Sequence, residues 1–433
     1  MIFFPCEPFF FPSPEPKRAK HAIFPVFIPF SGCPVRCVFC AQEVQTGRVQ
    51  TGVEQALVSA GERLESMTPE RHGTKDGKKP SQIDDKPTFS GICKGTPTPA
   101  FNGGNECRLR LHGGALPKTT LSTISNGKPL GSKYTEAGAG RQAQCDMSRN
   151  FLELAFYGGT FTALERRDFL ACLRFGAYWR DRGVIRAMRC STRPDAVTPA
   201  ILSELKDAGF TCVELGIQSF SEGALAVSRR GYSAEQARRG CAMVKESGLM
   251  LGVQLLPGMP GHAREDADGD IRETIGLSPD FVRLYPCLVL DGTALAAMWR
   301  RGEYTPWDLE ETVDFLAEAC HAFRRENIPI IRMGLAEEPG LADHVLAGPR
   351  HPAIGGMARS RALFIYIREQ TEQLLRKLGI SAPLHFRLSV PRRFQGEFWG
   401  HSGELATRYA SLGITGKNIS WWNEEHFCLE VAE

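Results

Sequence analysis

The sequence of 433 residues lacks any apolar run that approaches the ~20 residues needed by a membrane-spanning helix. Its N-terminus is rich in phenylalanine and proline and lacks the basic segment and small-residue cleavage site of a signal peptide. The formal net charge is only +3, so no strong excess of one sign points to a nucleic-acid partner. From these absences we expect a cytoplasmic protein with no membrane partner.

The sequence also lacks the paired cysteine spacing of a disulfide framework or of a structural zinc site. Its 14 cysteines are spread along a long chain, many of them singly within apolar stretches, where cysteine acts as a small hydrophobic residue. A reducing compartment suits such thiols. Only one C-x2-C pair is present, whereas structural zinc sites usually have a fourth ligand and a second pair.

What is present is a C-x3-C-x2-C motif formed by Cys33, Cys37 and Cys40, in a loop with Gly32 and Pro34. Iron–sulfur clusters are held by cysteine thiolates at short, fixed spacings. Three thiolates on one loop can hold three irons of a four-iron, four-sulfur (4Fe-4S) cluster and leave the fourth iron open. The motif therefore predicts a cluster that can bind a further ligand.

A long segment between two structured parts has an unusual composition. Residues 69–149 contain 12 glycines and 7 prolines, with few periodic apolar positions. Such a segment buries too little apolar surface to offset its chain entropy, so we expect a disordered insertion. We accordingly divide the chain into residues 1–68 (N-terminal segment and first strand–helix unit with the cysteine loop), the insertion, residues 150–340 and a C-terminal extension, 341–433.

Outside this segment, short apolar runs alternate with helical patterns. Helix-start signals are Thr198-Pro199, Ser233-x-x-Gln236, Thr162-x-x-Glu165 and Thr305-Pro306. Repeated strand–helix units imply parallel strands with right-handed crossovers. We therefore expect the α/β class, with a partial (β/α)6 TIM-like barrel and a small α+β C-terminal appendage. The predicted barrel strands are 23–29, 152–157, 185–191, 212–218, 250–256 and 281–286.

The cysteine loop and the strand ends resemble the radical S-adenosylmethionine (radical SAM) superfamily. Within it, the barrel resembles the radical domain of the Elongator catalytic subunit and its bacterial relatives, over roughly residues 20–68 and 150–340. The similar segments are 156–161, 190–195, 214–220, 229–232, 254–261 and 283–293, two of which are also similar to oxygen-independent coproporphyrinogen oxidase. The resemblance implies a radical SAM enzyme with a 4Fe-4S cluster on Cys33, Cys37 and Cys40, and S-adenosyl-L-methionine as cofactor.

The resemblance also implies which residues serve S-adenosyl-L-methionine. Two glycines at a strand end allow close approach of a ligand to the backbone, and in the superfamily this turn receives the cofactor amino group. An arginine fork suits the cofactor carboxylate. The residues expected to bind the cofactor are Gly158, Gly159, Thr160, Ser191, Gln218 and Arg230. Relatives tend to carry an acidic residue in place of Ser191, and no residue is assigned to the catalytic step.

The resemblance favours tRNA as substrate, with chemistry of the wobble-uridine type and an electron donor such as ferredoxin or flavodoxin. Alternatives are radical chemistry on a small molecule or tetrapyrrole, and a non-catalytic RNA-binding or electron-transfer protein on the same fold. Only ~90 residues follow the barrel, fewer than the acetyltransferase domain of the Elongator subunit would need. In the tail, a Gly400-x-x-Gly403 loop is similar to an RNA-clamping turn or is part of a packing appendage, and Arg350, Arg359 and Arg361 are candidates for anionic-substrate contacts.

Overall fold

The computed structural model describes residues 8–15, 22–47, 52–67, 152–335, 338, 340–379 and 386–431. The expected insertion at 69–149 lies outside these residues. Among the helices that the structure describes, none is both long and apolar enough to cross a membrane.

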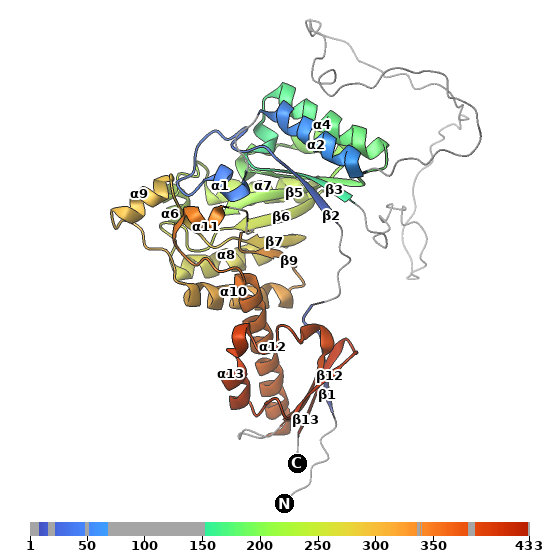
Figure 1. The fold of residues 1–433 in the computed structure, drawn as a ribbon, viewed down its shortest axis with the longest axis vertical. Helices are drawn as coiled ribbons and strands as arrows, with labels where there is room; N and C mark the ends of the chain where they lie inside the picture. The colour runs from blue at the N-terminus through green and yellow to red at the C-terminus, as the bar shows by residue number, and fades with distance from the viewer. Residues whose placement is uncertain are drawn as a thin grey trace, which may run out of the picture.

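A seven-stranded parallel sheet forms the centre of the larger part of the molecule (Figure 1). Its strands follow one another in chain order, so that each pairs with the next through a crossover. This arrangement places the carboxyl ends of all seven strands at one edge, where loops can build a site. The strands are β2 (Ala22–Phe27), β3 (Leu152–Tyr157), β4 (Ala187–Thr192), β5 (Phe210–Gln218), β6 (Met250–Leu255), β7 (Phe281–Leu284) and β9 (Ile330–Met333).

The partial barrel is confirmed, with one strand more than the sequence predicted. The six expected strands occur within a few residues of their expected positions, and β9 adds a seventh beside β7. Helices pack on the outer face of the curled sheet: α2 (Val53–Met67), α4 (Arg166–Asp181), α5 (Pro199–Ala208), α7 (Ala234–Glu246), α8 (Arg264–Leu277) and α10 (Leu309–Arg325).

Two helix starts follow the predicted capping chemistry and two do not. Thr198 accepts a hydrogen bond from the backbone of Ile201, and Ser233 forms a reciprocal capping box with Gln236. The helix expected to begin at Thr305-Pro306 instead begins after Asp308, whose carboxylate accepts from the backbone of Glu311.

The capping box expected at Thr162 and Glu165 is also wrong. Thr162 lies in a short 3-10 turn, and its hydroxyl bonds to the hydroxyl of Thr192 at 2.7 Å. Glu165 is itself the residue that precedes α4 and makes no side-chain cap. Thr162 bonds to Thr192, at the end of β4, instead of capping the helix, because both hydroxyls are buried and need hydrogen-bond partners.

A second sheet of four strands forms a separate core below the barrel (Figure 1). Its order is β1 (Phe9–Pro12), β13 (His426–Val431), β11 (Phe386–Pro391) and β12 (Ile419–Trp422). The N-terminal strand thus pairs with the last strand of the described chain, and Phe11 stacks on Phe427. The long helix α12 (Ile354–Leu378) and the short α13 (Ala406–Ser411) pack on this sheet.

The two parts meet where α12 packs along α10, and one arginine links them. Arg361 on α12 is 3% exposed and forms ion pairs with Glu310, Asp314 and Glu404, each at 2.8 Å. Arg359 pairs with Glu397. The expectation that Arg361 contacts an anionic substrate is therefore wrong, because packing commits its guanidinium group to three protein carboxylates. For Arg359, which is partly exposed, the expectation stays a prediction.

We predict that Arg361→Met destabilises the fold by about 1–3 kcal/mol, since it leaves three carboxylates close together without their shared cation. Two of those carboxylates, of Glu310 and Asp314, are 67% and 49% exposed and can rehydrate, which limits the loss. Arg359→Met is the matched control, with an expected loss of about 0–1 kcal/mol because its ion pair is partly exposed. Urea denaturation measures both, and equal losses would contradict the linking role of Arg361.

Candidate active site

The cysteine loop leaves β2 at the carboxyl edge of the sheet and packs closely against the turn after β3. The backbone N–H of Thr160 donates to the carbonyl of Ser31 at 2.8 Å. A Cβ atom on Gly32 would lie 2.4 Å from the carbonyl oxygen of Thr160, and one on Gly159 would lie 2.0 Å from that of Ser31. Both glycines have positive φ angles, of 73° and 45°. Glycine is therefore required at both positions by backbone conformation and by space.

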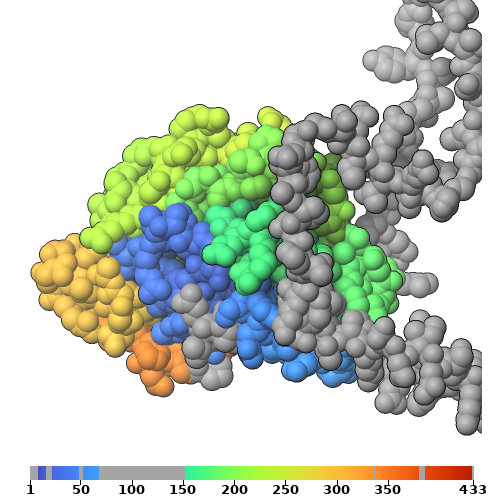
Figure 2. Space-filling view, turned by 90° about the horizontal axis from the view of Figure 1, so that it is seen from above, coloured from blue at the N-terminus to red at the C-terminus, as the bar shows by residue number. Residues whose placement is uncertain are grey.

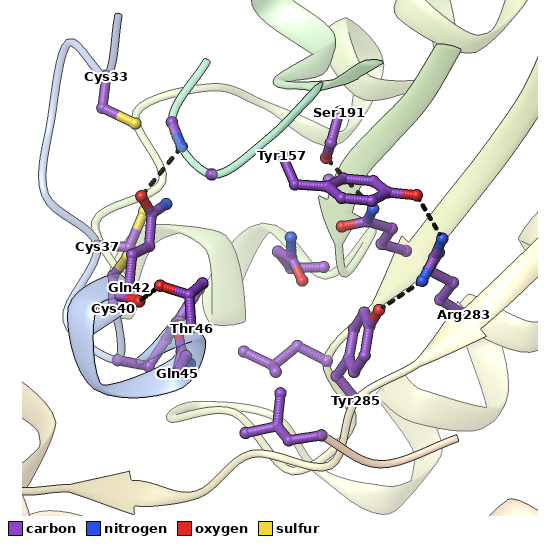
Figure 3. A pocket seen from close by; sticks show the side chains of 18 of the residues that line it. Cys33, Cys37, Cys40, Gln42, Gln45, Thr46, Tyr157, Ser191, Arg283 and Tyr285 are labelled. Atoms are coloured by element: carbon purple, nitrogen blue, oxygen red, sulfur yellow. Dashed lines mark hydrogen bonds between the residues drawn. The ribbon is translucent and has the colours of Figure 1, made fainter. Parts of the chain in front are cut away.

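All three motif cysteines line one cavity of about 530 Å³, a size usual for ligand sites. Figure 2 views one face of the molecule, on which the blue N-terminal part of the barrel lies between green residues and the yellow to orange later chain. In Figure 3 the cysteines lie on one side of the cavity, and Tyr157, Ser191, Arg283 and Tyr285 lie on the other.

None of the three motif cysteines forms a disulfide bond. Burial raises the pKa of Cys33, and burial with the neighbouring Cys37 raises the pKa of Cys40 to about 12. Among the described residues, no group of three His, Cys, Asp or Glu side chains is arranged to hold a single metal ion. A cluster makes a different demand, because each cysteine binds a separate iron and the thiols need not converge on one point.

A buried cation beside the loop supports the fit of a thiolate-bound cluster. Arg230 is 6% exposed, and its Nη1 donates to Cys37 Sγ at 3.0 Å. Within the described residues it forms no ion pair with a carboxylate, although a buried charge normally needs a counter-charge. The cysteine ligands of a bound cluster would be thiolates and would supply that negative charge. The donor set and its surroundings therefore suit a cluster held by Cys33, Cys37 and Cys40.

All the residues that the sequence predicted for the cofactor border the same cavity. Gly158 and Gly159 form the turn after β3, and Thr160 Oγ1 lies 3.4 Å from Cys33 Sγ. Ser191 accepts a hydrogen bond from Gln254 Nε2 at 3.3 Å. Their proposed contacts with S-adenosyl-L-methionine stay predictions.

Gln218 occupies a strained position at the end of β5. Its φ angle is 70°, which is rare for a residue other than glycine. The pairing of β5 with β6 is irregular here, and a Cβ on Gly216 would lie 2.9 Å from Gln218 Nε2. The side chain therefore lies over the glycine and is held at the cavity wall. Strained residues of this kind are concentrated at functional sites.

Sequence reasoning missed Gln42, which joins the two loops of the site. It lies on α1 (Gln42–Thr46), directly after the cysteine loop. Its Oε1 accepts hydrogen bonds from the backbone N–H groups of Phe30 and Gly159, the latter at 3.0 Å. Its position two residues after Cys40 was the one sign in the sequence that it could belong to the site. The spacing of apolar residues does not reveal its bonds to Phe30 and Gly159.

Sequence reasoning also missed a polar network at the inner side of the cavity. Arg283 donates to the hydroxyls of Tyr157 and Tyr285, at 2.8 and 3.2 Å, and pairs with Glu214. Gln254 Nε2 also donates to Glu214, at 2.9 Å. Burial, and secondly the carboxylate of Glu214, raise the pKa of Tyr157, so this phenol stays protonated. The sequence feature that could have indicated this network is the presence of charged residues, such as Glu214 and Arg283, within otherwise apolar strands.

A Ser-His-Asp arrangement behind the cavity is structural. His262 lies 3.0 Å from Asp270 and 3.4 Å from Ser219, all of them buried. The serine hydroxyl accepts from the backbone of Ser221, and the histidine Nδ1 accepts from that of Gly258. These bonds fix the turns after β5 and β6, and the serine has no open face for a substrate.

Sequence profiles of two domains match this chain. The Radical SAM superfamily profile matches residues 146–273, and the Radical_SAM C-terminal domain profile matches 279–362. This chain belongs to the radical SAM superfamily of enzymes. Neither matched range includes the cysteine loop, so the assignment of the cluster ligands depends on the motif and on its place at the cavity.

Curated relatives of this chain include tRNA uridine(34) acetyltransferases and Elongator complex protein 3. The chain is 37% identical over 192 residues to a tRNA uridine(34) acetyltransferase of Methanocaldococcus jannaschii, covering 39% of this chain and 35% of the relative. It is 30% identical over 186 residues to Elongator complex protein 3 of Mus musculus, covering 38% and 34%. The chain thus spans about a third of the length of these relatives.

A solved structure of Methanocaldococcus infernus Elp3 is similar at 26% sequence identity, with a TM-score of 0.42. The matched part covers 54% of this chain and 55% of that one.

The close packing of the two loops gives a test of the site. We predict that Gly159→Ala prevents incorporation of the cluster, because its Cβ would collide with backbone atoms that cannot move away independently. Gly183→Ala is the control: its φ angle is also positive, at 71°, but nothing lies within 4 Å of its Cβ. We expect this control to lose about 1 kcal/mol of stability from strain and to bind iron normally. The measurement is the iron content of each variant after anaerobic reconstitution. Equal iron in Gly159→Ala and Gly183→Ala would contradict the prediction.

Proposed function

We propose that this protein is a radical SAM enzyme that modifies tRNA at a uridine. The observation that supports it best is the convergence, on one cavity, of the three motif cysteines and the strand-end residues of a radical SAM barrel. The tRNA substrate is inferred from the relatives, whose names specify uridine 34 of tRNA. The transferase class is inferred from the same names.

In this proposal Cys33, Cys37 and Cys40 hold a 4Fe-4S cluster. When bound, the cluster supplies the electron that cleaves S-adenosyl-L-methionine and yields a 5′-deoxyadenosyl radical. A ferredoxin or flavodoxin is the proposed class of electron donor. The turn formed by Gly158, Gly159 and Thr160 presents backbone to the cofactor, and Ser191 and Gln218 flank it, while Arg230 lies against the cysteine loop.

The inner side of the cavity favours an uncharged reacting group. Arg283, which lines the cavity, is paired with Glu214. Behind it Arg189 is paired with Glu214 and Glu153, so these four buried residues carry no net charge. A nucleobase is uncharged and offers donors and acceptors to groups such as Tyr285 and Gln254. A carboxylate of a tetrapyrrole would meet, in Arg283, an arginine already paired with a glutamate. The pairing of Arg283 therefore supports an uncharged group beside it, as the tRNA proposal requires.

The experiment is an anaerobic assay of the reconstituted protein with dithionite, S-adenosyl-L-methionine and bulk tRNA. We expect 5′-deoxyadenosine by chromatography, a higher yield when tRNA is present, and a mass change in a uridine nucleoside. The Cys33, Cys37 and Cys40 triple alanine variant should lose both the iron charge-transfer absorption and 5′-deoxyadenosine.

The alternatives give different results in the same assay. A triple variant that retained a normal cluster would refute the cluster assignment. Production of 5′-deoxyadenosine that tRNA neither stimulates nor couples to a nucleoside change would favour a small-molecule substrate. A cluster with no cleavage of the cofactor would favour an electron-transfer or RNA-binding role.

A further inference from the structure

The hydrogen bond from Arg230 to Cys37 joins residues 193 positions apart in the sequence. Arg230 lies between α6 (Glu222–Val227) and α7, and its side chain reaches the back of the cysteine loop. The same region also holds the loop backbone, because Val38 donates its N–H to the carbonyl of Ser228 at 3.2 Å. The contact is therefore part of how the loop is seated.

The guanidinium is fixed by several other bonds. Its Nη2 donates to the carbonyl of Gly216 at 2.6 Å and to the hydroxyl of Tyr232 at 2.7 Å, and its Nε donates to the same hydroxyl at 2.9 Å. The Tyr232 hydroxyl in turn donates to the carbonyl of Ile217 at 2.7 Å. Together these contacts hold Nη1 on Cys37 and limit the positions that the arginine can adopt.

These contacts leave the guanidinium little capacity for another ligand. Of its five N–H groups, four have acceptors in Gly216, Tyr232 and Cys37. A carboxylate bound in the usual bidentate manner needs two parallel donors. The predicted pairing with the cofactor carboxylate would therefore require Arg230 to give up contacts that it already makes.

Hydrogen bonds to the sulfur ligands and the local charge set the reduction potential of an iron–sulfur cluster. A cationic N–H donor on a thiolate ligand withdraws negative charge from the sulfur and stabilises the reduced form, which carries one more electron. We propose that Arg230 raises the reduction potential of the cluster through its hydrogen bond to Cys37. This inference depends on the proposed cluster and assigns Arg230 a positioning and tuning role, separate from cofactor binding.

The test is an anaerobic redox titration of the reconstituted full-length protein, followed by electron paramagnetic resonance of the reduced cluster. Arg230→Met should shift the midpoint potential to a more negative value, and Arg230→Lys should shift it less. The matched control is Arg36→Met. Arg36 lies on the same loop next to Cys37, but its guanidinium packs over the ring of Phe30 and is exposed. A larger shift for Arg230→Met than for the control assigns the effect to the N–H···S bond.

A second measurement separates this role from cofactor binding. Calorimetry should show that S-adenosyl-L-methionine binds Arg230→Met with an affinity within about twofold of the native protein. Cofactor cleavage by this variant should be slow with a weak reductant and recover with a stronger one. An unchanged midpoint potential together with a tenfold or greater loss of affinity would overturn the proposal in favour of the carboxylate contact.

Milder variants cover the case in which Arg230→Met fails to hold iron. Tyr232→Phe keeps the arginine and removes one of its anchors, so it should shift the potential in the same direction by a smaller amount. Loss of iron from Arg230→Lys and from Tyr232→Phe as well would show that the arginine only builds the loop, and would overturn the proposal. Failure of the native protein to hold a cluster would instead refute the proposed function.

Discussion

The close contact between the loop after β2 and the turn after β3 is the constraint on which the site depends. Ser31 and Gly159 touch through backbone atoms, and parallel pairing of the two strands continues to the bond from Ile28 to Tyr157. This contact places the cysteines beside the glycine turn, although more than 100 residues separate them in the sequence. Residues outside the contact, such as Gln42, reinforce it but could not create it.

The elements that could be predicted are those specified by local chemistry. Apolar runs predicted six strands of the barrel, and capping residues such as Thr198 predicted where helices begin. The C-x3-C-x2-C spacing predicted that Cys33, Cys37 and Cys40 belong to one site. The seventh strand, β9, was missed because it is short and half-buried, with Arg332 among its four residues. The pairing of β1 with β13 was missed because it joins opposite ends of the described chain, and no local pattern specifies such a contact.

The contacts within the site could be predicted only in part, for the same reason. The resemblance identified Arg230 as a residue that serves the cofactor, but its partner depends on how the segment between α6 and α7 packs behind the loop. Arg361 had the opposite outcome: the sequence made it a candidate for contact with an anionic substrate, whereas packing surrounds it with three carboxylates. In both cases tertiary packing, which the sequence pattern does not contain, decides the partner of a long charged side chain.

The distribution of buried charge distinguishes the two halves of the cavity. Behind the inner side, two glutamates and two arginines compensate one another, and such buried pairs add little stability when their desolvation is counted. Beside the cysteines, the charge of Arg230 is balanced by no carboxylate of the described chain. Burying this cation costs free energy unless an anion arrives, and the thiolate ligands of a cluster are anions placed at that position. Binding of the proposed cluster would therefore offset the free-energy cost of burying Arg230, and would couple assembly of the cluster to the stability of the loop that holds it.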